Sequence, residues 1–314
     1  MNLRMSLHRR NTTQVHVHRP DRQRPTHTRH AVLAVVLFSL LTVSCSPLRI
    51  ADLVTPRDGY KLHADLAYGA ADRQRLDVYV PGRAAAPLAV VVFFYGGRWQ
   101  GGNKRDYRFV AQALADRGFL VVVPDYRLFP NVVFPTFIED GARAVAWIHR
   151  HIDTYGGDRK QIFLAGHSAG AHIAAMLSFD ERYLTGAGVP AASIQGFLGL
   201  AGPYDFLPME SADLLQIFGP VEHHGATQPI NFVDGSEPPA LLLHGLKDES
   251  VLPRNSRRFA SAIQARGGRV DARYFAHGNH FTIIAAFIRP LQSQSSLLED
   301  IETFIRNRLS EVES

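Results

Sequence analysis

Cysteine is almost absent from this 314-residue chain, which contains Cys45 and no other. Residues 46–314 therefore cannot form a disulfide with one another. Acidic residues are equally scarce at the start of the chain, where residues 1–30 hold seven arginines and one aspartate. The uncharged apolar run at residues 31–44 falls short of the roughly 20 residues that a membrane-spanning helix needs.

A basic segment followed by a short apolar core is typical of an export signal. The first 44 residues follow that order, and Cys45 comes directly after them. The stretch Leu41-Thr42-Val43-Ser44-Cys45 resembles the bacterial lipoprotein cleavage box, although its second residue departs from the usual leucine. We therefore expect residues 1–45 to be a leader that exports the protein and anchors it to a membrane through a lipidated Cys45. A cleaved signal, giving a periplasmic or secreted protein, and an uncleaved anchor remain open.

The net charge of +5 belongs to this leader, because residues 46–314 carry 27 basic and 28 acidic side chains. A nearly balanced remainder gives no reason to expect a nucleic acid partner. Its length suits one domain with a full core. We predict a linker over residues 46–60 and one domain over residues 61–312.

Apolar strands alternate with helical patterns in that domain. Leu88–Phe94 and Phe119–Pro124 are unbroken apolar runs, as in strands buried on both faces. Further strands are expected at Leu66–Gly69, Arg75–Pro81, Gln161–Ala165, Ile194–Leu200, Ala240–Leu243 and Arg269–Phe275. Helices are expected at Tyr107–Arg117, Phe137–Tyr155, Ala171–Leu177, Pro253–Arg266 and Phe281–Leu309, the last broken near Pro290. The alternation predicts an α/β fold with a mostly parallel, doubly wound sheet and helices on both faces. Residues 203–236, of mixed pattern, are predicted to pass over the functional site as a small lid.

One strand-to-helix junction holds the sequence Gly166-His167-Ser168-Ala169-Gly170. A serine between two glycines at such a junction lies on a sharp, strained turn, which exposes its hydroxyl above the sheet. The helix N-terminus then points at the group that the serine attacks. Ser168 is the predicted nucleophile.

A serine hydroxyl reacts at neutral pH only with a base to take its proton and a third group to orient that base. Such partners lie beyond the carboxyl ends of later strands. Asp248 follows the Ala240–Leu243 strand and is the predicted acid, with its neighbour Glu249 as the alternative. His280 follows the last predicted strand and is the predicted base, with His277 as the alternative.

Attack on a carbonyl builds negative charge on its oxygen, which backbone N–H groups stabilise. One donor is expected from Ala169, directly after the serine. The other is expected from the loop after Leu88–Phe94, at Gly96, Gly97 or Arg98, where the glycines let the backbone approach the substrate closely.

Five motifs stand out along the chain: Tyr95–Trp99, Asp125–Leu128, Gly156–Asp158, Gly166–Gly170 and Asn279–Phe281. Together they resemble those of α/β-hydrolase carboxylesterases related to hormone-sensitive lipase, including prenylcysteine methylesterase-like and arylformamidase-like enzymes. The order serine, aspartate, histidine is also that of α/β-hydrolases. The resemblance implies the α/β-hydrolase fold and cleavage of small-molecule esters of small or medium acyl chain through an acyl-enzyme on Ser168, with Asp248 as acid and His280 as base. It implies no metal site and no organic cofactor.

Two positions depart from the pattern that the resemblance leads us to expect. Tyr95 stands where histidine is usual, and Arg98 where a third glycine or an alanine is common. Backbone donors survive a change of side chain, so we expect the oxyanion hole to remain. The Arg98 guanidinium is hypothesised to point into the substrate pocket and to favour anionic or polar esters.

Two other functions stay open at the level of the sequence. An amidase or arylformamidase would use the same three residues, because both reactions pass through an acyl-enzyme. A scaffold that binds without catalysis would be expected to have lost one of the three, and none is missing.

Overall fold

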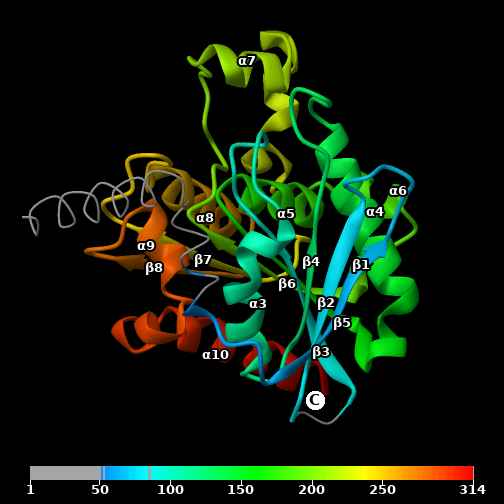
Figure 1. Cartoon of the computed structure of the whole chain (residues 1–314). Helices are drawn as coiled ribbons and strands as arrows, with labels where there is room; N and C mark the ends of the chain where they lie inside the picture. Colours follow the sequence, from blue (N-terminus) through cyan, green and yellow to red (C-terminus); the bar gives the residue numbers. More distant parts are fainter. Residues whose placement is uncertain (1–50, 52–53, 84–85, 314) are drawn as a thin grey trace, which may run out of the picture. The chain divides into compact units, whose positions relative to one another are not determined.

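Eight strands form a single sheet in the computed structural model, which describes residues 51, 54–83 and 86–313 (Figure 1). The predicted leader, residues 1–45 with Cys45, lies outside the described residues, as does part of the predicted linker. The strand order is β1-β2-β4-β3-β5-β6-β7-β8. β2 runs antiparallel to β1 and β4, and the other neighbouring pairs are parallel. The strands are β1 (Tyr60–Ala67), β2 (Arg75–Pro81), β3 (Leu88–Phe94), β4 (Leu120–Pro124), β5 (Gly157–His167), β6 (Ile194–Leu200), β7 (Ala240–Gly245) and β8 (Val270–Phe275).

The centre of the sheet is apolar on both faces. Every residue of β3 and β4 is buried, and Val91 pairs with Val121 and Val92 with Val122 between them. Helices cover both faces of a sheet of this kind, so its central strands present no polar side to water. The edge strand β1 is mostly exposed and carries polar residues.

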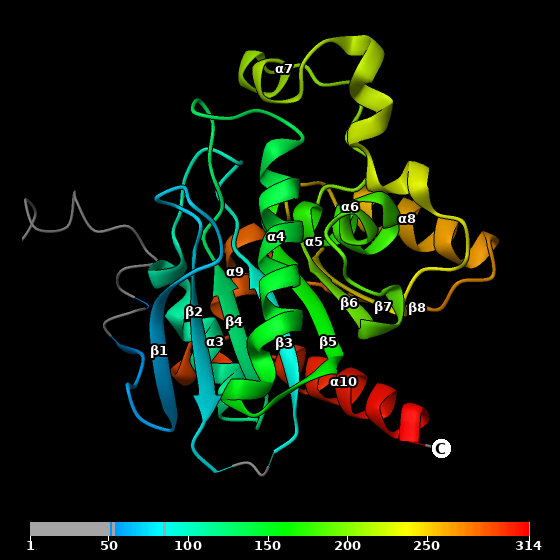
Figure 2. The ribbon, with the colours of Figure 1, turned by 90° about the vertical axis from the view of Figure 1, so that its right-hand side faces the viewer.

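Helices pack on both faces, as predicted (Figure 2). α3 and α10 share one face, where Arg306 of α10 donates a hydrogen bond to the Arg117 carbonyl just after α3. α4, α5 and α8 share the other, where Phe179 of α5 lies 4.7 Å from Phe259 of α8 between ring centres. The helices are α3 (Arg108–Ala115), α4 (Thr136–His151), α5 (Ala169–Phe179), α6 (Glu181–Gly186), α7 (Ala212–Phe218), α8 (Arg254–Ala265), α9 (His280–Ala285) and α10 (Leu297–Glu313).

Shorter 3-10 helices connect these elements. They are η1 (Lys104–Tyr107), η2 (Ile152–Tyr155), η3 (Ala191–Ser193), η4 (Val221–Thr227), η5 (Pro229–Phe232) and η6 (Arg289–Gln294). Within the described part of the chain, no helix has the length and apolar character that crossing a membrane requires.

Several elements differ from the sequence prediction. β1 spans Tyr60–Ala67, whereas the first strand was expected at Leu66–Gly69 and residue 60 in the linker. β5 begins at Gly157, because backbone pairing with Leu88 of β3 extends it through polar residues. α6 was not predicted; the Asp180 side chain caps it by accepting a hydrogen bond from the Arg182 N–H. The predicted C-terminal helix is broken near Pro290, as expected: it is divided into α9, η6 and α10, with Pro290 in the first turn of η6, where its missing N–H costs nothing.

The excursion over residues 203–236 holds α7, η4 and η5. In Figures 1 and 2, α7 stands above the carboxyl ends of the parallel strands. The Phe134 N–H donates to the Ile217 carbonyl, which joins α7 to the loop before α4. This segment therefore overhangs the edge of the sheet where the predicted site residues lie.

Candidate active site

Ser168 occupies the turn between β5 and α5. Its backbone has φ 55° and ψ −124°, a sparsely populated conformation that such turns impose on the residue at their apex. The two flanking glycines are required by close packing. A Cβ on Gly170 would lie 2.0 Å from the Phe94 carbonyl oxygen, and one on Gly166 would lie 2.3 Å from the Gly170 carbonyl oxygen. Both contacts are with backbone, of the neighbouring strand β3 and of the helix α5, so a side chain does not fit at either position.

His280 and Asp248 lie beside this serine. The His280 Nε2 is 2.9 Å from Ser168 Oγ, and its Nδ1 is 2.7 Å from Asp248 Oδ2. Asp248 follows β7 and His280 begins α9 after β8, so three separate strand ends supply the three groups. The alternatives Glu249 and His277 are exposed, and neither makes these contacts.

Asp248 is buried and saturated with hydrogen-bond donors. Its Oδ1 accepts from the N–H groups of Ser250 and Val251 at 2.9 and 2.8 Å. Burial raises the pKa of this carboxyl, but hydrogen bonds from His244, His280 and Val251 outweigh burial and hold the pKa below its usual range. Asp248 is therefore ionised near neutral pH and accepts a hydrogen bond from His280 Nδ1–H, which leaves Nε2 free to accept from the serine hydroxyl.

His244, at the end of β7, contacts both Asp248 and the loop that carries it. Its Nε2 lies 2.8 Å from the Val251 carbonyl oxygen and 3.3 Å from Asp248 Oδ2. Both are acceptors, so Nε2 carries the proton, and Nδ1 accepts from the Ser256 hydroxyl at 2.7 Å. His244 thus fixes the loop that presents Asp248.

His167 links the serine turn to the histidine loop. Its Nε2 donates to the His280 carbonyl oxygen at 3.0 Å, and the two rings lie 4.8 Å apart. Burial lowers the pKa of His167 to about 3, so the ring is neutral. Its Nδ1 has no hydrogen-bond partner among the described residues.

The loop after β3 lies directly against the serine. A Cβ on Gly96 would lie 3.0 Å from both the His167 carbonyl oxygen and Ser168 Cβ. The next three residues, Gly97, Arg98 and Trp99, all have positive φ, at 138°, 54° and 59°. Two of these three carry side chains, and such a run is costly unless its surroundings enforce it. Ala169, the first residue of α5, completes the set of predicted donors around Ser168.

The side chain of Arg98 is already paired. Its Nη2 lies 2.6 Å from Asp213 Oδ2 of α7, and Gln100 Nε2 contacts the same oxygen at 2.9 Å. The hydrogen bond from Arg98 is the main cause of an Asp213 pKa below its usual range. Asp213 was not singled out in the sequence, because nothing near it in the chain marks it as a partner of Arg98.

A cavity of about 930 Å³ opens over Ser168 and His280. Its walls come from the loop after β3, from the excursion and from α9, and they include Trp99, Phe206 and Ile284. The excursion therefore supplies part of the cavity wall. Among the described residues, no group of three or more His, Cys, Asp or Glu side chains could hold a metal ion.

A model of the BD-FAE family matches residues 76–263, more than half of the chain, with Ser168 and Asp248 inside the match. The chain belongs to the BD-FAE family. The match with this family ends before His280, whose place is therefore known from the structure alone.

Curated relatives fall in the groups that the sequence motifs resemble. A rice (Oryza sativa subsp. japonica) protein described as a probable isoprenylcysteine alpha-carbonyl methylesterase is 31% identical over 270 residues, 77% of this chain and 62% of the relative. This chain thus spans less than two thirds of that relative's length. The kynurenine formamidase of Danio rerio is 27% identical over 231 residues, 71% of this chain and 76% of the relative. These relatives confirm the resemblance to prenylcysteine methylesterase-like and arylformamidase-like enzymes that the sequence motifs indicated.

Solved structures support the fold. A truncated carbohydrate esterase from gut microbiota matches with a TM-score of 0.71 at 20% identity, covering 81% of this chain and 98% of that chain. Together with the strand order, this confirms the predicted α/β-hydrolase fold.

Proposed function

We propose that this protein hydrolyses carboxylic esters of small or medium acyl chain through an acyl-enzyme on Ser168. The observation that carries the proposal is the chain of two hydrogen bonds from Asp248 through His280 to Ser168, at the base of an accessible cavity. Three side chains from distant parts of the sequence meet there in the geometry of a nucleophile, its base and an orienting acid.

In the first half of the reaction, Ser168 Oγ attacks the ester carbonyl carbon while its proton passes to His280 Nε2. The imidazolium that forms is stabilised by the Asp248 carboxylate at 2.7 Å. Collapse of the tetrahedral intermediate breaks the bond to the alcohol, and His280 returns the proton to the departing oxygen. The acyl group remains on Ser168.

In the second half, water attacks the acyl-enzyme and gives its proton to the same Nε2. The free acid leaves and Ser168 is restored. In both halves the negative oxygen would be held by the N–H groups of Ala169 and of the loop at Gly96, Gly97 and Arg98. One such donor contributes about 2.7–4 kcal/mol to lowering the barrier.

The cavity supports a substrate of limited size with an apolar part. At about 930 Å³ it lies at the upper end of the range of small-molecule sites. Trp99, Phe206 and Ile284 give it apolar walls, and Arg98 with Asp213 gives it a charged rim. These features favour an apolar acyl group inside and a polar alcohol group toward the rim.

Hydrolysis of an amide or formamide is the second candidate. The kynurenine formamidase relative favours it, and the same three residues would serve. The leaving group then is an amine, which His280 would have to protonate before it can depart.

One assay separates these candidates. A protein lacking residues 1–45 would be tested on p-nitrophenyl esters from acetate to decanoate, with aryl amides and aryl formamides in parallel and Ser168→Ala as control. We expect acetate and butyrate to be turned over fastest, and the alanine variant to be inactive. Faster formamide than ester cleavage would favour the second candidate, and turnover that survives in Ser168→Ala would refute the nucleophile. A substrate panel without turnover and an alanine variant with unchanged binding would favour a scaffold.

We also propose that residues 1–45 export the protein and that Cys45 is lipidated. The basic and apolar order of the leader supports this proposal. Expression of the full chain in bacteria with labelled palmitate, beside Cys45→Ala, tests it. Label in the wild type alone is expected; a soluble periplasmic protein without label would instead favour a cleaved secretory signal.

A further inference from the structure

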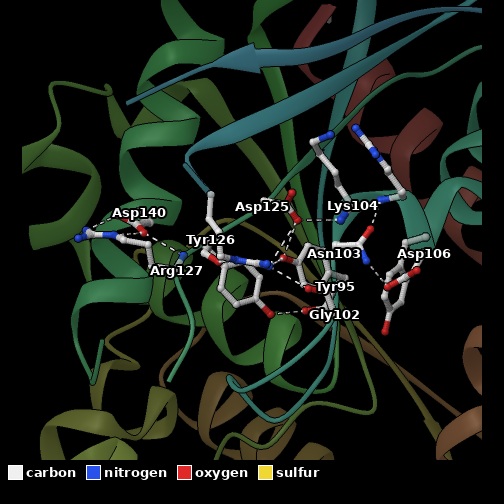
Figure 3. Close-up of polar contacts among 12 residues, drawn as sticks. Tyr95, Gly102, Asn103, Lys104, Asp106, Asp125, Tyr126, Arg127 and Asp140 are labelled. Atoms are coloured by element: carbon white, nitrogen blue, oxygen red, sulfur yellow. Dashed lines mark hydrogen bonds and ion pairs between the residues drawn. The ribbon is translucent and has the colours of Figure 1, made fainter. Parts of the chain in front are cut away.

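The loop that reaches Ser168 is closed by polar contacts at its two ends, Tyr95 and Gly102, which we call its neck. This oxyanion loop, residues 95–102, leaves β3 at Tyr95 and returns beside it at Gly102, where an added Cβ would lie 2.9 Å from a ring carbon of Tyr95. The tip between them holds the three residues of positive φ. In Figure 3, Tyr95 and Gly102 lie side by side, next to Asp125 and Tyr126.

Arg73 binds both ends of this loop. It lies in the turn between β1 and β2, and its Nη2 donates to the Tyr95 hydroxyl at 2.7 Å and to the Gly102 carbonyl oxygen at 2.8 Å. Its Nε donates to the Tyr126 carbonyl oxygen at 2.8 Å. One guanidinium thus joins the start of the oxyanion loop, its end and the segment after β4.

The groups bound by Arg73 are themselves fixed. The Tyr95 hydroxyl donates to Asp125 Oδ1 at 2.7 Å, and the same oxygen accepts the Lys104 N–H at 2.8 Å (Figure 3). The Tyr126 hydroxyl donates to the Tyr95 carbonyl oxygen at 2.7 Å, and the two rings stack at 4.8 Å. Tyr95 and Tyr126 are fully buried, so the neck has little freedom to rearrange.

Backbone strain at the tip makes the neck important. Residues with unfavourable φ persist only where the surrounding structure over-determines them. The oxyanion loop contacts Ser168 through Gly96 and carries the proposed N–H donors at Gly97 and Arg98. If the neck opened, the tip could relax and its N–H groups would turn away from the substrate oxygen.

We propose that Arg73 is a positioning residue for ester hydrolysis, holding the oxyanion loop in the geometry that its N–H donors need. The inference rests on the proposed function. Arg73 lies before the segment that the BD-FAE model matches, so family membership does not account for it. Arginine suits the role because its planar fork offers several donors at fixed angles, whereas lysine donates from a single atom.

The expected effect falls on the chemical step. Negative charge on the oxygen develops in the tetrahedral intermediate and the transition states around it, and not in the bound ester, so a displaced donor lowers kcat and leaves KM nearly unchanged. Small misplacements of catalytic groups cost up to about 100-fold. We expect Arg73→Met to lower kcat about 10- to 100-fold with KM within about threefold, and Tyr95→Phe to lower kcat by a smaller factor.

The test compares these variants with Arg159→Met, in which the same substitution breaks an exposed ion pair with Asp153. Esterase kinetics, thermal unfolding and hydrogen exchange of peptides covering residues 95–104 would be measured on each. Exchange should be faster in Arg73→Met than in the wild type over this segment, and unchanged in Arg159→Met. Arg73→Lys replaces Arg73→Met if the latter is unfolded at the assay temperature, with the same expectation.

A folded Arg73 variant with wild-type kcat would overturn the proposal, as would a rise in KM alone or a loss of kcat without faster exchange in the loop. Exchange needs no substrate. A wild type that cleaves no ester would therefore count against the proposed function, while exchange would still report whether Arg73 orders the loop.

Discussion

Asp248 and Glu249 are adjacent carboxylates with different surroundings. Asp248 is buried, with two backbone N–H donors on one oxygen and histidine nitrogens at 2.7 and 3.3 Å from the other. Glu249 is exposed. The hydrogen-bond donors around each carboxylate therefore decide which one serves as the acid. The sequence alone could rank the two residues, but it could not show these donors.

Replacing Asp248 by asparagine should remove most of the activity. The amide presents an N–H or a weaker acceptor to His280 Nδ1, so the tautomer with a free Nε2 is no longer favoured. We expect kcat to fall about 10³- to 10⁴-fold for Asp248→Asn and less than about fivefold for Glu249→Gln. Steady-state kinetics on a p-nitrophenyl ester would check both, and equal losses would leave the assignment of the acid without support.

At the scale of elements, α7 meets the oxyanion loop through Arg98 and Asp213. The pair is largely exposed, so its contribution to stability is small. The Asp213 carboxylate does neutralise the charge that Arg98 would present to the cavity. The hypothesis that Arg98 attracts anionic esters therefore changes. In this structure the guanidinium faces a carboxylate of the protein.

Asp213→Asn should therefore release the charge of Arg98 toward the substrate. We expect KM for an acidic ester, such as mono-p-nitrophenyl succinate, to fall about two- to fivefold relative to KM for p-nitrophenyl butyrate. The difference should shrink in 1 M salt, which screens exposed charges. An equal change in KM for both esters would show that Arg98 does not distinguish substrates by their charge.

α5 carries a buried histidine that makes stability depend on pH. His172 lies among the rings of Trp99, Phe206 and Phe218, and its Nε2 donates to the Thr227 carbonyl oxygen at 2.8 Å. Burial lowers its pKa to about 4 from a usual value of 6.5. Between these values the unfolded chain binds a proton that the folded protein does not, so the free energy of unfolding falls as pH falls.

His172→Gln should flatten this dependence while keeping a donor for Thr227. Each such group contributes up to about 1.4 kcal/mol per pH unit in its window. Urea unfolding at pH 7, 6 and 5 should give a shallower decline for the variant than for the wild type. Parallel curves would mean that His172 is protonated in the folded state.

At the scale of the whole molecule, the sequence predicts the strands of the sheet better than it predicts the side-chain contacts around them. β2, β3 and β6 have the predicted bounds, because each is a largely apolar run that a proline ends or that a glycine follows within two residues. Ser168, Asp248 and His280 could be found because each follows its own strand in a known order. Even so, the excursion at 203–236 could be placed only roughly.

Arg73 shows what the sequence does not reveal. It is a polar residue in a turn, and nothing near it indicates that it binds Tyr95, Gly102 and Tyr126. The same holds for Asp213, which lies far along the chain from Arg98. Contacts of this kind depend on how loops meet in three dimensions, and neither periodicity nor local motifs encode them.

The central claim is that Ser168 is the nucleophile of an ester hydrolase, and covalent labelling tests it most directly. The protein would be treated with diethyl p-nitrophenyl phosphate, then examined by intact mass and peptide mapping, with Ser168→Ala beside it. We predict one diethylphosphoryl group per chain on the peptide that contains Ser168, release of one p-nitrophenolate, and loss of ester turnover in step with labelling. Labelling of another residue, or ester turnover that persists in Ser168→Ala, would contradict the account.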